Sequence, residues 1–458
     1  MIRHRPLGRG HPYRIDPEQR YPVWPATDES FILNATTDAN AVKVVVECDV
    51  RGRRQFVNAG QIDLPVEKDS SGTHLAAAAG TSAVSKDRRR WQAKLPGLPA
   101  ETGMRYRFIA GRWRTRWYEV QPFEWRRDGG RLGIESASDL ASRLIPESTE
   151  WMTGGRGAAR VRFALRLDSK EHVVGFGERF DALDQRGHRL DAQVFEQYKR
   201  QGNRTYMPMP FAIVTGAEGW GFHVATNRRT WFDVGATDEN RLGVEIELDP
   251  EDSGPNVLLR LFGGQPADVL GQFLDITGRP TPPPDWVFGL WMSGNEWNTQ
   301  ARVMEMVRRS LEEQVPAGVV VIEAWSDEAT FTVFRDAEYV PQKDRPHRLS
   351  DFRFPKEGAW PDPKRMVEDL HDLGLKVLLW QIPLLKQMRP GPPQLVADRN
   401  VMLEQGYAIK TSDGRPYRNR GWWFPGALMP DFTSEAARSW WLSKRRYLVE
   451  DIGIDGFK

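Results

Sequence analysis

The chain has 458 residues, a length that predicts two to four domains. Its 64 Lys and Arg residues nearly balance its 62 Asp and Glu residues, and the net charge of +2 argues against nucleic acid as a main partner. The composition, 40% hydrophobic and 28% charged, is typical of a globular protein and excludes a largely disordered one.

The single cysteine, Cys48, excludes an intrachain disulfide, a cysteine-based zinc site and an iron–sulfur cluster held by this chain alone. The eight histidines form no HExxH pattern, so we expect no metal and no cofactor. The basic N-terminus has no apolar segment behind it, and no apolar run approaches the ~18 residues of a membrane helix. We therefore expect a cytoplasmic protein without membrane partners.

Residues 1–130 are predicted to form a first β-sandwich, resembling an immunoglobulin-like or carbohydrate-binding-like domain. Short alternating segments lie between turn residues at 41–50, 91–98 and 104–123, and the last is a hairpin around Ala110. Residues 66–90 are predicted as an exposed loop with a basic run. The glycine pairs and low hydrophobicity of residues 127–160 predict a linker.

Residues 131–280 are predicted to form a second, larger antiparallel β-sandwich. Seven strand-like segments recur between residues 161 and 264 with turns between them. An amphipathic helix follows at 267–278, and the connector RPTPPPDW separates it from the rest of the chain.

Beyond the connector, residues 284–458 alternate between strands and helices, which predicts a parallel sheet. The segments are strands at 286–293, 317–325, 376–385 and 454–458, and helices at 301–314, 363–374 and 434–453. An open doubly wound sheet and a closed eightfold barrel both fit this alternation. No glycine-rich phosphate turn follows the first strand, and the long insertion at 326–358 is typical of barrel loops, so the barrel is favoured over the open sheet; the resemblance described below implies strands 1–4 of a (β/α)8 barrel.

The ligand side of such a sheet is the carboxyl end of its strands. Glu323 and Lys458 lie there, together with three aromatic residues: Trp291, Trp325 and Trp380. Carboxylates accept hydrogen bonds from sugar hydroxyls and flat rings cover sugar C–H faces, so this pattern favours a pyranose. The alternative for each ring is a place in the barrel core.

Several segments resemble glycoside hydrolase family 31, the α-glucosidases and α-xylosidases. VGFGERFDALDQRG is similar to its galactose-mutarotase-like β-sandwich. PPPDWVFGLWMSGNEW, VVVIEAWSDEATF, WPDPKRMVEDLHDLGLKVLLWQIP and GIDGFK are similar to the opening half of its barrel. These matches occur in the family's order and cover about residues 160–458.

The resemblance implies a retaining α-glycosidase with a carboxylate nucleophile and a carboxylic acid/base about 5 to 5.5 Å apart. Both are expected after Lys458, so the chain itself is expected to contain no catalytic residue and to be inactive. Glu323 matches a family Asp that binds sugar hydroxyls, Trp380 an aromatic residue of the same subsite, and Lys458 a lysine that precedes the nucleophile. Gln197, in a loop of the second sandwich, is a further candidate for substrate binding.

The expected partner is an α-linked oligosaccharide or glycoside, and the full-length protein is a candidate homo-oligomer. Two alternatives stay open. One is a non-catalytic carbohydrate-binding protein with a vestigial half-barrel, and the other is a lyase on the same scaffold.

Overall fold

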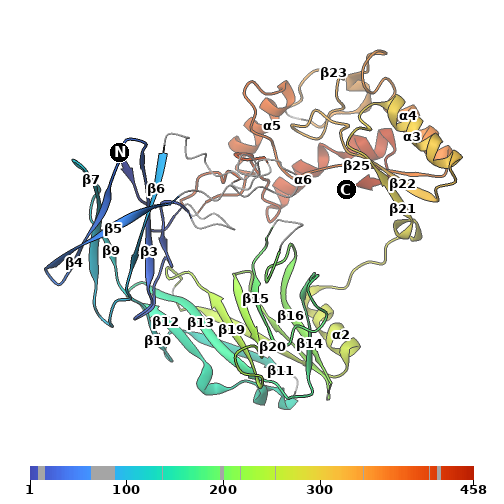
Figure 1. The fold of residues 1–458 in the computed structure, drawn as a ribbon. Coiled ribbons are helices and arrows are strands. Elements are labelled where there is room, and N and C mark those ends of the chain that lie inside the picture. The colour runs from blue at the N-terminus through green and yellow to red at the C-terminus, as the bar shows by residue number, and fades with distance from the viewer. Residues whose placement is uncertain are drawn as a thin grey trace. The chain divides into compact units, whose positions relative to one another are not determined.

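The computed structural model describes residues 1–8, 16–62, 88–136, 138–195, 201–216, 218–252, 254–343, 345–411, 413–419 and 424–458. These residues form two compact units, which meet in the sequence between Pro280 and Thr281 (Figure 1). Each unit is described by itself below.

The first unit begins with a nine-stranded antiparallel sheet that folds over on itself into two layers. The long strand β5 joins the layers because it pairs first with β4 and then, over its last three residues, with β6. Large apolar side chains such as Phe31 and Phe108 are buried between the layers. The strands are β1 (Ile2–Arg3), β2 (Arg20–Tyr21), β3 (Phe31–Asp38), β4 (Val44–Val50), β5 (Arg53–Ile62), β6 (Arg88–Leu95), β7 (Met104–Ala110), β8 (Trp113–Arg114) and β9 (Tyr118–Val120).

Part of the predicted loop at 66–90 is a strand. Arg88–Arg90 open β6 and pair with the end of β3, whereas residues 66–87 lie outside the described residues. The end of the basic run is therefore part of a strand, in which Arg88 lies 3.5 Å from the buried carboxylate of Glu18.

His4 is buried in this first sandwich. Its Nδ1–H donates to the Asn34 carbonyl at 2.7 Å, which leaves Nε2 to accept from the Tyr106 hydroxyl at 2.9 Å. Burial lowers the pKa of His4 to about 4. The imidazole is therefore neutral at pH 7 and fixed in one tautomer.

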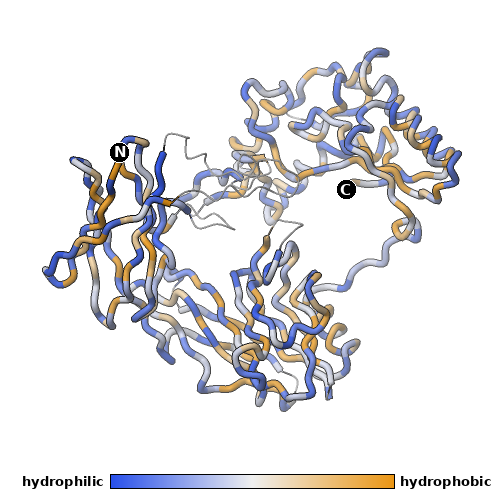
Figure 2. Tube along the Cα trace, in the orientation of Figure 1, coloured by the Kyte–Doolittle hydropathy of each residue, from blue (hydrophilic) through white to orange (hydrophobic). Residues whose placement is uncertain are grey.

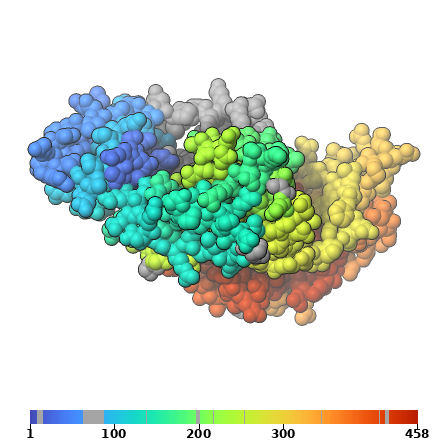
Figure 3. All heavy atoms as spheres, turned by 90° about the horizontal axis from the view of Figure 1, so that it is seen from below, coloured from blue at the N-terminus to red at the C-terminus, as the bar shows by residue number. Residues whose placement is uncertain are grey.

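The second sandwich packs a six-stranded sheet on a five-stranded sheet around one large apolar core. Figure 2 shows apolar and polar residues mixed along these strands, as expected where one face of each sheet is buried. In Figure 3 its atoms, coloured from cyan to yellow-green, form one closely packed body. The six-stranded sheet contains β10 (Glu124–Arg126), β12 (Glu150–Gly154), β13 (Gly157–Arg166), β19 (Arg241–Glu247), β18 (Thr230–Val234) and β15 (His188–Ala192); the other contains β11 (Arg131–Ser136), β20 (Asn256–Gly263), β17 (Trp220–Val224), β16 (Pro208–Thr215) and β14 (His172–Gly177).

The linker predicted at 127–160 is wrong, because β11, β12 and the start of β13 occupy this segment. Its glycine pair serves close packing instead. A Cβ on Gly129 or Gly130 would lie 2.3 or 2.6 Å from side-chain atoms of Trp151, which is itself buried in the core.

Helix α2 (Pro266–Thr277) closes the first unit. Phe273 of α2 stacks on Phe211 of β16 with ring centroids 4.0 Å apart. Residues 279–284, the proline-rich connector, are exposed.

The second unit contains four parallel strands in the order β21, β22, β25, β26. This order equals the order in the chain, as in a barrel, whereas a doubly wound sheet reverses direction at a switch point. The elements are η3 (Asp285–Phe288), β21 (Leu290–Ser293), α3 (Gln300–Glu312), β22 (Ala317–Ile322), β23 (Glu338–Tyr339), η4 (Leu349–Asp351), β24 (Phe352–Arg353), α4 (Pro363–Asp372), β25 (Lys376–Leu379), α5 (Pro393–Glu404), α6 (Glu435–Ser443), η5 (Leu448–Ile452) and β26 (Gly456–Phe457).

The two faces of this sheet are used differently. Val320 and Ile322 of β22 pack with residues of α3 and α4, whereas Val319 and Val321 pack on the other face with Leu378. In the wall of a barrel, helices cover the outer face of the sheet, and the side chains of the inner face pack against one another. The predicted combination of two β-sandwiches and a partial barrel is confirmed.

Three details of the second unit differ from prediction. The buried strand expected at 286–293 is a 3-10 turn followed by β21, whose Leu290 is 48% exposed. The helix expected at 434–453 is divided into α6 and a π-helical turn, η5. Helix α5 and the β23–β24 hairpin were not predicted. Within the described ranges, no helix is long and apolar enough to cross a lipid bilayer.

Candidate functional site

The carboxylate of Glu323 lies at the carboxyl ends of the parallel strands, directly after β22. Its Oε1 accepts hydrogen bonds from the Ser293 hydroxyl, at the end of β21, and from the Lys458 ammonium, directly after β26, both at 2.6 Å. The Glu323 side chain is 13% exposed and that of Lys458 is 49% exposed. Glu323 and Lys458, both predicted as site residues, are therefore partners in one ion pair.

Trp380 follows β25 at the same edge. Its amide donates to the Ile322 carbonyl at 3.1 Å, which continues the ladder between β22 and β25. Its partly buried ring meets Phe331 edge-on, with centroids 5.2 Å apart. The next residue, Gln381, donates its amide to the Lys458 carbonyl at 2.9 Å, so Trp380 and Lys458 are held on neighbouring strand ends.

Trp325 and Trp291 are placed differently from Trp380. Trp325 is fully buried, meets Phe334 edge-on, and donates its Nε1–H to the Trp380 carbonyl at 2.9 Å, so it supports Trp380 from the core. Trp291 stacks on Trp286 and donates to the Val287 carbonyl at 3.0 Å. Its indole is therefore held by residues that precede β21.

The remaining predicted site residue, Gln197, lies outside the described residues.

A buried guanidinium, not predicted from the sequence, joins the loops that carry these residues. Arg445 donates to the Gln381 side chain at 2.9 Å and to the Thr330 carbonyl at 3.2 Å, and its guanidinium lies 3.7 Å from the centre of the Trp441 ring. Gln381 also donates to the Phe331 carbonyl at 2.7 Å. Burial lowers the pKa of Arg445 to about 9. In the sequence, the one feature that points to Arg445 is its spacing of four residues from Trp441 within the helix predicted at 434–453.

Asp327, a carboxylate in the loop after β22, is engaged by its own loop. It accepts from the amides of Ala329, Thr330 and Phe331 at 3.0 to 3.1 Å and from the Thr330 hydroxyl at 2.9 Å. Burial raises the pKa of Asp327, while these hydrogen bonds favour its ionised form. These bonds hold the loop between β22 and Phe331.

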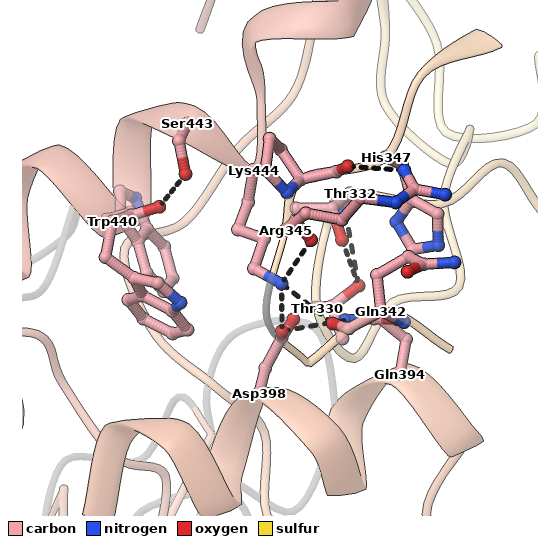
Figure 4. A network of polar contacts seen from close by, with 12 residues as sticks. Thr330, Thr332, Gln342, Arg345, His347, Gln394, Asp398, Trp440, Ser443 and Lys444 are labelled. Atoms are coloured by element: carbon pink, nitrogen blue, oxygen red, sulfur yellow. Dashed lines mark hydrogen bonds and ion pairs between the residues drawn. The ribbon is translucent and has the colours of Figure 1, made fainter. Parts of the chain in front are cut away.

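A second ion pair, which is buried, holds the neighbouring helices (Figure 4). Asp398 of α5 and Lys444, which follows α6, lie 3.2 Å apart and are 3% and 4% exposed. Gln394 donates to Asp398 at 2.7 Å, and Lys444 donates to the Gln342 carbonyl at 2.9 Å. Burial raises the pKa of Asp398, although Lys444 and Gln394 favour its charged form. This network fixes both helices to the loop after β22.

The groups at the strand ends suit a neutral polyhydroxylated ligand. Glu323 supplies an acceptor, Lys458 and Ser293 supply donors, and Trp380 supplies an aromatic ring. In the described part of the chain, no three His, Cys, Asp or Glu residues are grouped as metal ligands.

Comparison with protein families gives two matches. Residues 280–458 match the glycosyl hydrolases family 31 TIM-barrel domain, and residues 8–110 match the 1,3-alpha-isomaltosidase-like N-terminal domain. The second match covers the sandwich for which the sequence suggested an immunoglobulin-like or carbohydrate-binding-like domain.

Individual proteins are similar over all or most of the chain. A 1,3-alpha-isomaltosidase of Kribbella flavida is 45% identical over 100% of this chain and 62% of its own length. A cycloalternan-degrading enzyme of Trueperella pyogenes, solved with a covalent intermediate, is 45% identical with a TM-score of 0.88, and this chain covers 63% of it. An isomaltosyltransferase of Sporosarcina globispora is 38% identical over 74% of this chain and 31% of its own length. The chain thus spans less than two thirds of these relatives.

Proposed function

Because this chain belongs to glycoside hydrolase family 31, we propose that it forms part of a retaining α-glycosidase that releases isomaltose from α-1,3-linked substrates. The observation that carries this proposal is the 45% identity to a 1,3-alpha-isomaltosidase over the entire chain. A structure of the Trueperella pyogenes enzyme in complex with isomaltose, 44% identical to this chain, supports the same product.

In this proposal the strand-end residues bind the sugar at the cleavage site. Glu323 accepts hydrogen bonds from sugar hydroxyls, Lys458 donates to them, and Trp380 packs on the apolar face of the ring. The Glu323–Lys458 pair has no net charge, which suits a neutral saccharide.

The covalent steps are assigned to two carboxylates that follow Lys458 in the whole protein, as the family resemblance implies. The nucleophile attacks the anomeric carbon while the glycosidic C–O bond breaks and the acid protonates the leaving oxygen. Water then attacks the anomeric carbon, the bond from that carbon to the nucleophile breaks and frees its carboxylate, and the water gives its proton to the same acid/base residue. Glu323 and Asp327 are not assigned these roles because the resemblance places both catalytic carboxylates after Lys458.

The test is an assay of the whole protein with cycloalternan and with isomaltosyl-α-1,3-glucosides, followed by NMR. We expect isomaltose as the product, released first as its α-anomer because two inversions retain configuration. Release of glucose or xylose alone would contradict the proposed specificity. Release of the β-anomer would contradict the retaining mechanism.

The 458-residue chain by itself provides a second test. We expect no hydrolysis of these substrates, because loss of key groups from a catalytic unit costs several orders of magnitude in rate. Turnover at about 1 to 1,000 per second, the usual range for enzymes, would place the catalytic carboxylates within residues 1–458.

A further inference from the structure

The second unit contains a groove whose polar lining is strongly basic. The groove has a volume of about 660 Å³ and lies in the long segment between β25 and α6. Arg389 comes from the loop after β25, Arg399 from α5, and Arg418 from the loop after α5; Lys386 adds a fourth cation. No Asp or Glu lines this groove among the described residues.

These cations are not neutralised within the described part of the chain. No ion pair involves Lys386, Arg389, Arg399 or Arg418 there, and Arg418 makes only a long contact of 3.4 Å to the Gly426 carbonyl. Several acidic side chains of the surrounding segment are engaged elsewhere: Asp398 with Lys444, Glu404 with Lys343, and Asp413 with Arg415.

The guanidinium groups are close enough to influence one another. Arg418 is exposed, and its pKa is lowered first by partial desolvation and then by the positive charges of Arg399 and Arg389. Like charges held together without a counter-charge destabilise a fold, and a bound anion relieves that repulsion. Guanidinium groups bind tetrahedral oxyanions through paired N–H donors, a geometry that a lysine ammonium does not offer.

We propose that Arg389, Arg399 and Arg418 form a binding site for a small oxyanion, namely a phosphate or sulfate, either free or attached to a saccharide. This site carries an excess of positive charge, whereas the pair Glu323–Lys458 has no net charge. The proposal does not depend on the proposed hydrolysis. The neutral substrates named above contain no such group, so this groove adds an anionic ligand to what the protein recognises.

The test is calorimetric titration of inorganic phosphate into the full chain at constant ionic strength. We expect binding in the wild type and a dissociation constant at least tenfold weaker in Arg399→Gln and in Arg418→Gln, because each loses a charge-assisted hydrogen bond. The matched control is Arg308→Gln, which removes the same charge from an exposed position on α3 and should bind phosphate as the wild type does. Arg399 lies in helix α5, whereas Arg418 lies in a loop, where a substitution disturbs folding less. If Arg399→Gln does not fold, the result with Arg418→Gln decides the test.

Two comparisons complete the experiment. Binding of glucose 6-phosphate that is tighter than that of phosphate and is weakened by Arg418→Gln would identify a phosphorylated saccharide as the source of the anion. Equal binding of glucose 6-phosphate and phosphate would identify the free ion. Equal affinities in wild type, Arg399→Gln and Arg418→Gln, or no preference for phosphate over chloride, would overturn the proposal.

Discussion

Glu323 uses one of its two oxygens for the contacts made by the protein. Ser293 and Lys458 both donate to Oε1, and Oε2 has no hydrogen bond to the part of the chain that the structure describes. The pair is also partly exposed on its Lys458 side. A sugar hydroxyl can therefore donate to Oε2 without displacing Lys458.

Changing Glu323→Gln in the whole protein should lower kcat/KM by roughly 10- to 200-fold, because a hydrogen bond to a charged acceptor is worth about 1.5 to 3 kcal/mol. Lys458 loses its partner as well, so a fall in Tm is expected beside the kinetic effect. The control is Glu368→Gln, which removes a carboxylate from an exposed pair with Arg365 on α4. A change confined to Tm would show that Glu323 serves structure alone.

His4 should make the stability of the first sandwich depend on pH. Its pKa is about 4 in the folded state against 6.5 for the free side chain, so the unfolded chain binds more protons between these values. Folding stability should therefore fall as the pH decreases from about 6.5 to 4, by up to about 3 kcal/mol. Denaturant titrations at several pH values give the free energy of unfolding as a function of pH. This free energy should change less with pH in His4→Gln than in the wild type; the same pH dependence in both would contradict the low pKa of His4.

At the scale of elements, the pair Asp398–Lys444 joins α5 to the end of α6. Lys444→Met leaves the Asp398 carboxylate buried without its ion-pair partner, which typically costs 3 to 5 kcal/mol. Chemical denaturation should show this loss, and Asp398→Leu in the same chain should restore part of it. The control Lys343→Met breaks an exposed pair with Glu404 and should cost less than about 1 kcal/mol.

The elements that the sequence predicted well are those whose apolar residues follow the period of a strand or helix. Helix α5 was not predicted because the polar residues Gln394 and Asp398 lie on its buried side. Its apolar residues therefore do not recur with the helical period of 3.6 residues. The glycines at 129 and 130 had the composition of a linker, and it is their close approach to Trp151 and other atoms of the fold that explains them. In both cases the residue that explains the feature is distant in the sequence: Lys444 pairs with Asp398, and Trp151 lies against the two glycines.

The same reasoning applies to the candidate site. The rule that ligands bind at the carboxyl ends of strands was sufficient to select Glu323 and Lys458, which do lie together. It was not sufficient for Trp325, because a ring at a strand end turns either outward or into the core, and packing against Phe334 decides this. The bond between Arg445 and Thr330 joins residues 115 positions apart, which a single sequence does not reveal.

At the scale of the whole molecule, the two units have separate hydrophobic cores and an exposed connector at 279–284. Calorimetry of the full chain should therefore show two unfolding transitions. Leu259→Ala removes part of the second sandwich core and Leu370→Ala part of the barrel core, each costing about 2 to 5 kcal/mol. Each variant should lower the midpoint of one transition only.

A single transition that both variants lower equally would show that the two units unfold as one cooperative body. It would also mean that the connector does not separate them energetically.

The bonds from Arg445 to Gln381 and Thr330, with the bond from Trp325 to Trp380, join the strand-end loops of β22 and β25 through groups of the protein itself. The entropy lost in ordering these loops is therefore spent during folding and not during association. Saccharides that differ by one hydroxyl should then differ mainly in binding enthalpy, and the association rate should not be limited by loop closure.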